Sequence, residues 1–315
     1  MSQVVLVTGI SGRFGRLLTR HLHRTHTVLG IDRRPFPEAP RDVTLYRDDI
    51  RSRKTEDVFR THRIDTVIHL NVMHNPREMG EGAHRFNLVG TRQILEHCER
   101  YHVQKLIVLS TANLYGAGPD TQRYLAEDAP LLGGSRSALG RDLVELDMLC
   151  SAFFWQHPEV ETAILRPVHI VGTVLNGPSN YLRLPRLPVL WGFDPLLQLI
   201  HEEDVCAAVL AAMTPGARGV FNVAGPPSVP LTEVVRRTGK PRVVVPHLLW
   251  GPLMKRMFSA GLWSFPADQL DHLRYSCMVD DSRVRRELRF TPAYDLDATL
   301  EPFRGGPPGA ASRRS

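Results

Sequence analysis

A glycine-rich turn near the amino terminus constrains this chain more than any other feature. The segment Thr8-Gly9-Ile10-Ser11-Gly12-Arg13-Phe14-Gly15 directly follows the β-branched run Val4–Val7 and opens a helix pattern over 13–25. The glycines leave room for a tight turn, a pyrophosphate and a close helix–strand contact, and N–H groups at a helix start attract phosphate. Asp32 ends the next apolar run, where a carboxylate can accept hydrogen bonds from a ribose. The pattern predicts a dinucleotide site; the alternative is a chance glycine-rich turn.

Strand and helix patterns alternate through the first 170 residues. Short apolar runs predict strands over 4–7, 27–31, 43–46, 66–70, 106–109 and 162–165, and apolar periodicity predicts helices over 13–25, 83–101 and 139–155. Such alternation favours an α/β fold with a doubly wound parallel (Rossmann) sheet.

The sequence pattern changes after Gly172, where prolines cluster and the predicted helices and strands become short. We expect a dinucleotide-binding domain over 1–171, to which parts of 201–225 return, and a smaller C-terminal substrate lobe over 172–302. A helix over 205–213 and a strand over 220–223 are expected there. The glycine- and proline-rich tail, 303–315, is expected to be disordered.

Composition excludes several classes of protein. With 43% hydrophobic and 23% charged residues, the chain is neither disordered nor fibrous. Its net charge of +6 comes from scattered arginines, so nucleic acid is not an expected partner. No apolar run reaches the roughly 18–20 residues that span a bilayer. The four cysteines stand alone, which favours a reducing cytoplasm without disulfides or a metal site.

Two features bear on the choice of cofactor. Asp32 should repel the 2′-phosphate of NADP, which favours NAD. Arg33 and Arg34 follow directly and could bind that phosphate instead, so NADP remains the alternative.

The chain resembles the extended short-chain dehydrogenase/reductase family, and more specifically its NAD-dependent epimerase/dehydratase branch, whose best-known members are UDP-glucose 4-epimerases. The matching motifs run in family order to about residue 292: the glycine turn, Asp49-Ile50, His69-Leu70-Asn71, Asn87 with Gly90-Thr91, Ser110 to Gly116, Arg166-Pro167, His201-x-x-Asp204, and Glu287 to Pro292. The resemblance implies a cofactor site formed by Gly9, Ser11, Gly12, Arg13, Phe14, Gly15, Asp32, Arg33, Asp49, Ile50, Leu70, Asn71, Asn87 and Arg141.

The family's catalytic pair is replaced in this chain. Its members use Tyr-x-x-x-Lys, in which the tyrosine moves the substrate's proton and the lysine holds the nicotinamide ribose and lowers the tyrosine pKa. Alignment on Glu145 puts Ser137 at the tyrosine and Arg141 at the lysine. No lysine occurs between Lys105 and Lys240, so the substitution depends little on alignment.

Two other residues are candidates for moving the proton. Thr111 matches the second hydroxyl of the family's Ser-Ser/Thr-Ala segment, which helps catalysis. His169 stands where the nucleotide-sugar members carry an asparagine, and a histidine there is either structural or able to titrate near neutrality. His74 is a weaker candidate of the same kind.

The substrate side also departs from the family pattern. Leu197 occupies a position where many members have an arginine that reaches the nucleotide diphosphate, although Arg183 or Arg186 could supply that charge. The apolar segment Leu248 to Trp263 predicts a lid helix, or alternatively an apolar pocket or a membrane contact. The small-molecule substrate is therefore a nucleotide sugar, as the resemblance implies, or an apolar alcohol.

These observations leave two main hypotheses for function. The first is hydride transfer on a secondary alcohol, nominally of a nucleotide sugar, by an enzyme with an atypical or impaired active site. The second is a catalytically silent NAD(H)-binding sensor or regulator. A scaffold that has lost the cofactor is a third. The resemblance also implies a homodimer through the helices near 83–101 and 139–155.

Overall fold

The computed structural model describes residues 2–70, 72, 80–135, 138–174, 176–246, 256 and 271–304. Its centre is a seven-stranded sheet in the order β11-β6-β5-β4-β1-β2-β3, in which every pair of neighbours is parallel. The elements that build it are β1 (Val4–Thr8), α1 (Arg13–Leu22), β2 (Thr27–Ile31), β3 (Thr44–Tyr46), α2 (Arg53–Thr61), β4 (Thr66–His69), α3 (Glu81–Arg100), β5 (Lys105–Leu109), α4 (Ala138–Gln156), β6 (Glu161–Pro167), α6 (Glu202–Ala212) and β11 (Gly219–Val223). The predicted doubly wound sheet is confirmed.

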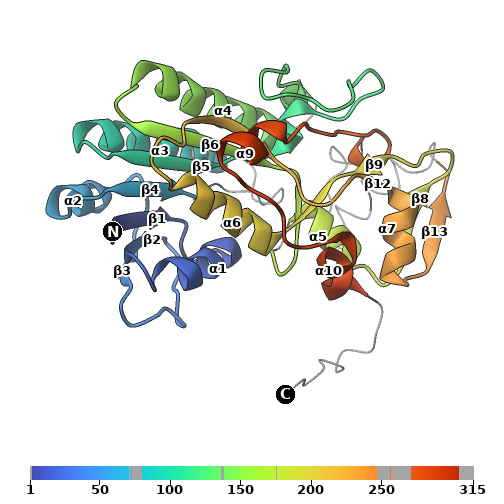
Figure 1. The fold of residues 1–315 in the computed structure, drawn as a ribbon, viewed down its shortest axis with the longest axis horizontal. Coiled ribbons are helices and arrows are strands. Elements are labelled where there is room, and N and C mark those ends of the chain that lie inside the picture. Colours follow the sequence, from blue (N-terminus) through green and yellow to red (C-terminus); the bar gives the residue numbers. More distant parts are fainter. Residues whose placement is uncertain are drawn as a thin grey trace.

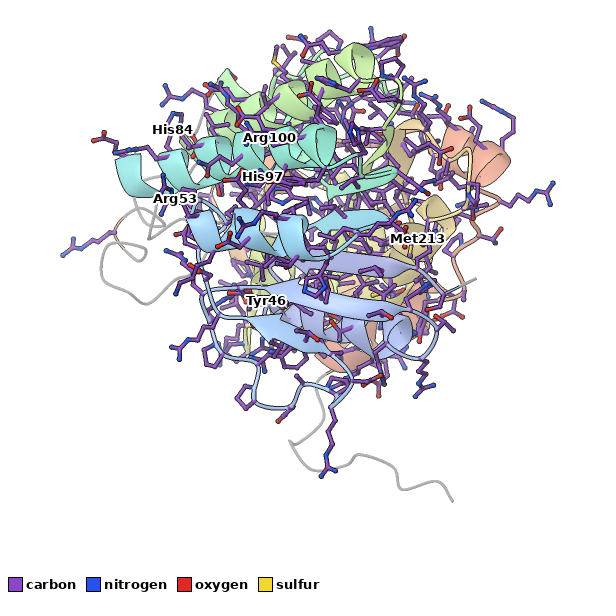
Figure 2. The ribbon with its side chains drawn as sticks, turned by 90° about the vertical axis from the view of Figure 1, so that its left-hand side faces the viewer. Tyr46, Arg53, His84, His97, Arg100 and Met213 are labelled. Atoms are coloured by element: carbon purple, nitrogen blue, oxygen red, sulfur yellow. The ribbon has the colours of Figure 1, made fainter. Side chains whose placement is uncertain are left out.

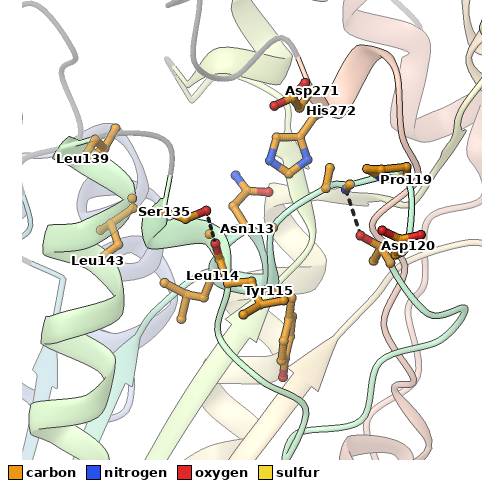
Figure 3. Close-up of a pocket in the computed structure, with 17 residues that line it drawn as sticks. Asn113, Leu114, Tyr115, Pro119, Asp120, Ser135, Leu139, Leu143, Asp271 and His272 are labelled. Atoms are coloured by element: carbon orange, nitrogen blue, oxygen red, sulfur yellow. Dashed lines mark hydrogen bonds between the residues drawn. The ribbon is translucent and has the colours of Figure 1, made fainter.

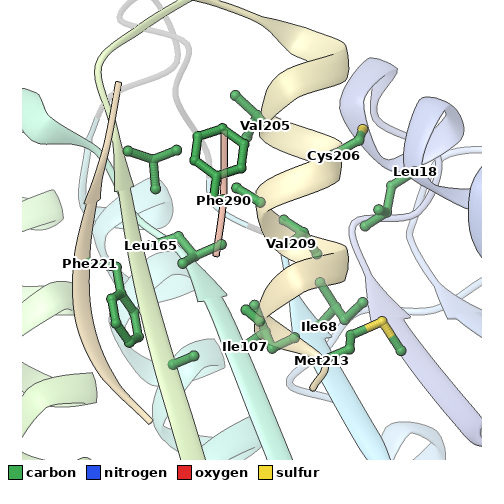
Figure 4. Close-up of a cluster of buried hydrophobic side chains, with 14 of the residues drawn as sticks. Leu18, Ile68, Ile107, Leu165, Val205, Cys206, Val209, Met213, Phe221 and Phe290 are labelled. Atoms are coloured by element: carbon green, nitrogen blue, oxygen red, sulfur yellow. The ribbon is translucent and has the colours of Figure 1, made fainter. Parts of the chain in front are cut away.

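Helices cover both faces of the sheet because its strands are apolar on both sides (Figure 1). Alternate residues of β1 point to opposite faces, so Val5 and Val7 belong to one buried cluster and Leu6 to the other. The first cluster includes the buried faces of α1 and α6, and Figure 4 shows Val205 and Val209 of α6 against the sheet. The second cluster includes the buried faces of α2, α3 and α4.

The helix α2 was not predicted from the sequence. Ser52 caps it, because its side-chain oxygen accepts a hydrogen bond from the N–H of Thr55 at 3.3 Å. Its short apolar face buries Val58 and Phe59, and the ring of Phe59 lies 5.1 Å from that of His97. Figure 2 shows His97 on α3, the helix beside α2. Charged residues dominate the segment, so packing on α3 outweighs its weak apolar signal.

The second lobe lies at the carboxyl edge of the sheet, since β6 leads almost directly into it (Figure 1). Its elements are β7 (His169–Val171), α5 (Gly177–Leu182), β8 (Leu187–Leu190), β9 (Leu196–Leu197), β10 (Leu199–His201), β12 (Val229–Pro230), α7 (Leu231–Thr238), β13 (Arg242–Val245) and α10 (Leu296–Leu300). The helix α9 (Ser282–Glu287) returns to the sheet, where Val284 joins the first cluster. A third apolar cluster, which includes Leu231, Val234 and Leu300, forms its core.

Capping interactions tie this lobe to the sheet. His201 caps α6 through Nδ1, which accepts from the N–H of Glu203 at 3.2 Å, and Asp204 accepts from the N–H groups of Ala293 and Tyr294 at 2.8 and 3.2 Å. Among the helices that the structure describes, none combines the length and apolarity needed to cross a bilayer. The expected lid segment 248–263 lies outside the described residues except for Arg256. Of the tail expected to be disordered over 303–315, the part from 305 onward lies outside the described residues, whereas Phe303 is buried in the core of the second lobe.

Candidate functional site

The glycine turn joins β1 to α1 with little spare room. Gly9 has φ +76°, a conformation that favours glycine. A Cβ on Gly15 would lie 2.6 Å from the carbonyl oxygen of Gly9 and 2.7 Å from that of Ile10. Gly12 begins α1 without a side-chain cap, and the first turn of α1 contains no acidic residue. The positive end of this helix is therefore not neutralised locally and suits a phosphate.

The two residues between Gly12 and Gly15 attach the turn to its surroundings. The guanidinium of Arg13 donates to the carbonyl oxygen of Thr173, just beyond β7, at 2.7 Å. Phe14 is partly buried against the cluster under α1 and α6. Arg13 thus links the turn to the C-terminal lobe.

Asp32 fastens the segment after β2 to the glycine turn. It is 4% exposed, and its Oδ2 accepts from the N–H of Ser11 at 3.1 Å. Arg34 donates to it through the backbone N–H at 2.9 Å and through Nε and Nη2 at 3.1 and 3.0 Å. The hydroxyl of Ser11 donates to the carbonyl oxygen of Arg34 at 2.8 Å. The carboxylate that was predicted to bind a ribose therefore already holds a cation in this structure.

A second carboxylate lies nearby, after β3. Asp49 accepts two hydrogen bonds from the guanidinium of Arg51, at 2.9 and 2.8 Å, and these hold the pKa of the carboxyl below its usual value. The guanidinium of Arg33 lies 4.5 Å from the ring centroid of Phe86, and that of Arg51 lies 5.3 Å from it. Ile50 is fully buried. These planar groups could stack on an adenine, and sequence reasoning missed Arg51 and Phe86.

His69, at the end of β4, is held between two hydroxyls. Its Nδ1 lies 2.7 Å from Oγ1 of Thr8 and its Nε2 lies 3.0 Å from Oγ1 of Thr91, and burial lowers the pKa of the ring to about 4. The ring is therefore neutral and structural at pH 7. The next residue, Leu70, donates its N–H to the carbonyl oxygen of Thr8 at 3.1 Å, which keeps the chain beside β1. Asn87 is fully buried on α3. Asn71 and His74 lie outside the described residues.

A buried polar network positions the end of β5. Asp147 and Arg166, which are 0% and 3% exposed, form an ion pair of 2.5 Å. The hydroxyl of Ser110 donates to Asp147 at 2.6 Å, and Arg166 donates to the hydroxyl of Tyr115 at 2.8 Å. Thr111 directly follows Ser110 in the sequence. Its Oγ1 accepts a hydrogen bond from the N–H of Asn113 at 3.2 Å. Since one strand separates β5 from β1, Thr111 is expected about 10 Å from the glycine turn.

The replaced catalytic pair falls at the start of α4. Ser137 lies outside the described residues. Arg141 is exposed on α4, and its backbone packs closely on Gly134, where a Cβ would lie 3.3 Å from the Cα of Arg141. A guanidinium offers a planar fork of hydrogen-bond donors.

A cleft of about 340 Å³ opens at the segment that follows Thr111 (Figure 3), although Thr111 itself is not among its described lining residues. Its described lining comes from the segment after β5, the start of α4 and the C-terminal lobe: Asn113, Leu114, Tyr115, Gly116, Ala117, Gly118, Pro119, Asp120, Thr121, Leu132, Gly133, Ser135, Leu139, Gly140, Leu143, Asp271 and His272. The side chains of Asn113 and His272 face the same space in Figure 3. No sequence motif marked His272.

His169 lies next to His272 in space, with ring centroids 5.4 Å apart and planes at 87°. Burial lowers the pKa of His169 to about 3 and that of His272 to about 4, and the neighbouring ring adds to the shift at His169. Both imidazoles are therefore neutral at pH 7. His169 follows β6, the neighbour of β5, and so lies at the same carboxyl edge of the sheet as Thr111.

A cluster of metal-ligating residues lies elsewhere, between α1 and α6. One ligand atom each of His21, Glu203 and Cys206 lies within 4.8 Å of the others. The ring of His21 already bonds to Glu203 at 2.8 Å, and burial raises the pKa of the Cys206 thiol, which disfavours the thiolate that a metal needs. We propose no metal site there.

Comparison with solved structures supports this architecture. The chain superposes on a UDP-glucose 4-epimerase (galE) from Stenotrophomonas maltophila with a TM-score of 0.75 and 20% identity, covering 95% of this chain and 96% of that one. A dTDP-glucose 4,6-dehydratase (rfbB) from Bacillus anthracis, crystallised with NAD, gives a TM-score of 0.74 at 17% identity, covering 96% and 95%. At these identities the likeness concerns the fold.

Sequence comparisons extend the likeness. An uncharacterized protein of Mycobacterium tuberculosis is 28% identical over 315 residues, covering 96% of this chain and 84% of the relative. The UDP-glucose 4-epimerase of Bacillus subtilis is 30% identical over 144 residues, covering 44% of this chain and 40% of the epimerase. The family model described as "NAD dependent epimerase/dehydratase family" matches residues 5–224. The chain therefore belongs to the NAD-dependent epimerase/dehydratase family.

Proposed function

We propose that this protein binds NAD across the carboxyl edge of its sheet and catalyses hydride transfer on a secondary alcohol. The observation that carries the proposal is the glycine turn at Gly9–Gly15, tied by Ser11 to the buried carboxylate of Asp32. The uncapped start of α1 would hold the pyrophosphate, and Asp32 would accept from the adenosine ribose. Because Arg34 already neutralises Asp32, NADP remains the alternative cofactor.

The remaining cofactor contacts follow from the elements around the turn. Arg33, Asp49 and Ile50 would frame the adenine, while Leu70, Asn71 and Asn87 would line the path toward the nicotinamide. Arg141 would bridge the nicotinamide ribose through its fork of donors. When bound, NAD supplies a ring carbon that accepts or returns a hydride.

The groups available to move the substrate proton are weaker acids or bases than the family's tyrosine. Thr111 and Ser137 offer aliphatic hydroxyls, which are much poorer acids than a phenol of pKa about 10. His169 is neutral, with its pKa lowered to about 3, and so accepts a hydrogen bond more readily than a proton. Loss of a positioned general acid/base typically costs about 10²–10⁴ in rate. We therefore propose slow turnover, first to be sought with nucleotide sugars, the substrates of similar proteins.

A second candidate function is a catalytically silent NAD(H)-binding sensor. It is favoured by the combination of an intact glycine turn with Ser137 and Arg141 at the catalytic positions. We also propose a homodimer through α3 and α4, whose exposed apolar residues include Val89, Met148 and Trp155 at 42%, 59% and 77% exposure.

One experiment separates the enzyme from the sensor. Protein saturated with NAD is given UDP-glucose, UDP-galactose and a panel of secondary alcohols, while reduced cofactor and epimerised sugar are measured. Turnover supports the enzyme, whereas NAD binding without turnover across the panel supports the sensor. The double variant Ser137→Tyr, Arg141→Lys should raise the rate if only the proton-handling pair is missing, and Arg92→Lys on α3 serves as the matched control.

A further inference from the structure

A histidine–carboxylate pair joins the first turns of α3 and α4. Nδ1 of His84 lies 2.8 Å from Oδ1 of Asp142, so one ring and one carboxylate connect the two helices. Figure 2 shows His84 near the start of α3. Each of these helices leads from one parallel strand of the sheet to the next, so both begin at the carboxyl edge. The pair therefore lies at the edge where the glycine turn lies.

The two members of the pair differ in their exposure to water. The side chain of Asp142 is 7% exposed, whereas that of His84 is 47% exposed. In the described part of the chain, Oδ2 of Asp142 is buried without a hydrogen-bond partner. A buried charge is costly unless it is paired. The proton on His84 therefore balances a carboxylate that receives little help from its other oxygen.

The groups that face His84 from α4 change its pKa in both directions. The hydrogen bond to Asp142 raises the pKa of the ring, and the carboxylate of Glu145 adds to this shift. Partial burial and the guanidinium of Arg141 oppose it. The charged residues beside His84 on α3 are both exposed: Glu81 and Arg85. The ring therefore keeps its proton to a higher pH than an isolated histidine does.

The pair is next to the residue that would hold the nicotinamide ribose. Arg141 directly precedes Asp142 on α4, and its side chain is exposed. Its backbone packs against Gly134, where an added Cβ would lie 3.3 Å from the Cα of Arg141. The place of the Arg141 guanidinium thus depends on how firmly the first turns of α4 are held, and the contact between Asp142 and His84 holds them against α3.

We propose that His84 and Asp142 are positioning residues, which hold the first turns of α4 against α3 and so place Arg141 for the nicotinamide ribose while His84 is protonated. When the pH rises and the ring loses its proton, Nδ1–H of the neutral ring can still donate a hydrogen bond, but the buried carboxylate loses its counter-charge. The start of α4 is then held less firmly, and NAD binds less tightly. The proposal rests on the proposed function for the role of Arg141.

The test is calorimetric titration with NAD from about pH 6 to pH 9. For the wild-type protein, Kd should rise about fivefold over this range, the difference between a charged and a neutral hydrogen bond. His84→Lys, which stays positively charged throughout, should keep the low Kd at every pH. His84→Gln, which is neutral throughout, should show the high Kd at every pH. A wild-type Kd that does not change with pH, or an unchanged pH dependence in His84→Gln, overturns the proposal.

His157→Gln provides the matched control. His157 directly follows α4, and its Nδ1 lies 3.8 Å from Oε1 of Glu99 near the end of α3, so it joins the same two helices at their opposite ends. This variant should keep the pH dependence of the wild type. If it removed that dependence as His84→Gln does, the effect would come from the stability of the helix pair in general, and the positioning role would be wrong.

An NMR titration of His84 in cofactor-free protein separates this inference from the proposed function. Asp142→Asn should lower the pKa of His84, because it removes the carboxylate that raises it, and an unchanged pKa would show that the ion pair does not form. Failure of NAD to bind at any pH would refute the proposed function and the role of Arg141, while the titration would still report on the pair. Binding of NAD with a Kd independent of pH would refute the positioning role and leave the cofactor site standing.

Discussion

Substitution of Gly15 by alanine tests the glycine turn at the atom where it is tightest. A Cβ there would lie 2.6, 2.7 and 2.8 Å from three backbone atoms, the carbonyl oxygens of Gly9 and Ile10 and the Cα of Ile10. Ordinary contact begins at 3.4 Å, so the Gly9 oxygen must move by about 0.8 Å. Backbone atoms cannot move away as easily as the end of a flexible side chain. Overpacking of this kind therefore lowers the free energy of unfolding by about 1–3 kcal/mol.

The same movement should weaken NAD binding. Hydrogen bonds from N–H groups span only about 2.7–3.2 Å, so a shift of about 0.8 Å breaks at least one bond from the turn to the pyrophosphate. A hydrogen bond to a charged group contributes about 1.5–3 kcal/mol, which corresponds to a Kd about 10- to 150-fold higher. Calorimetric titration with NAD measures the affinity, and urea unfolding measures the stability.

Gly82→Ala provides the matched control, because it also lies in the first turn of a helix and nothing lies within 4 Å of its added Cβ. This variant should leave NAD binding unchanged and stabilise the protein by up to about 1 kcal/mol through helix propensity. Wild-type affinity and stability in Gly15→Ala would show that the turn is not packed as described and that the reasoning about the cofactor site is wrong.

Three further predictions address the site and its supports. Asp147→Ala should lower the free energy of unfolding by about 3–5 kcal/mol, because it leaves the buried charge of Arg166 unpaired; an unchanged urea midpoint would contradict the network at β5. His69 has its folded pKa lowered to about 4 from 6.5, so the unfolded state binds more protons between these values. Its contribution to stability is complete above pH 6.5 and falls by about 1.4 kcal/mol per pH unit toward pH 4, and His69→Gln should flatten that dependence in urea titrations from pH 7.5 to 5. Asp32→Asn should raise the Kd for NAD at least tenfold and reduce the preference for NAD over NADP, and equal relative affinities before and after the change would assign the ribose to another residue.

The central sheet could be predicted from the sequence because its strands are buried on both faces. Continuous β-branched runs such as Val4–Val7 have few alternatives to a parallel strand, and the glycine turn fixes where the first helix begins. The helix α2 escaped prediction because only Val58 and Phe59 form its apolar face. Its stability comes from contact with α3, a partner that a local pattern does not reveal.

The proposed cofactor side of the site carries a clearer sequence signal than the proposed substrate side. Asp32 and the glycines form a local pattern with a physical reason for each position. His272 gave no signal, because the ring that it contacts, that of His169 in β7, lies about a hundred residues earlier in the chain. The ion pair between Arg34 and Asp32 likewise depends on side-chain geometry. The two residues lie close together in the sequence, but this closeness does not determine whether they pair.

The proposed function depends most directly on where a dinucleotide binds. A crystal structure of the wild-type protein grown with excess NAD should show the pyrophosphate against the N–H groups of the turn at Gly9–Gly15 and the adenosine ribose on Asp32. A turn left empty in that crystal, or a dinucleotide bound elsewhere on the protein, would contradict the account.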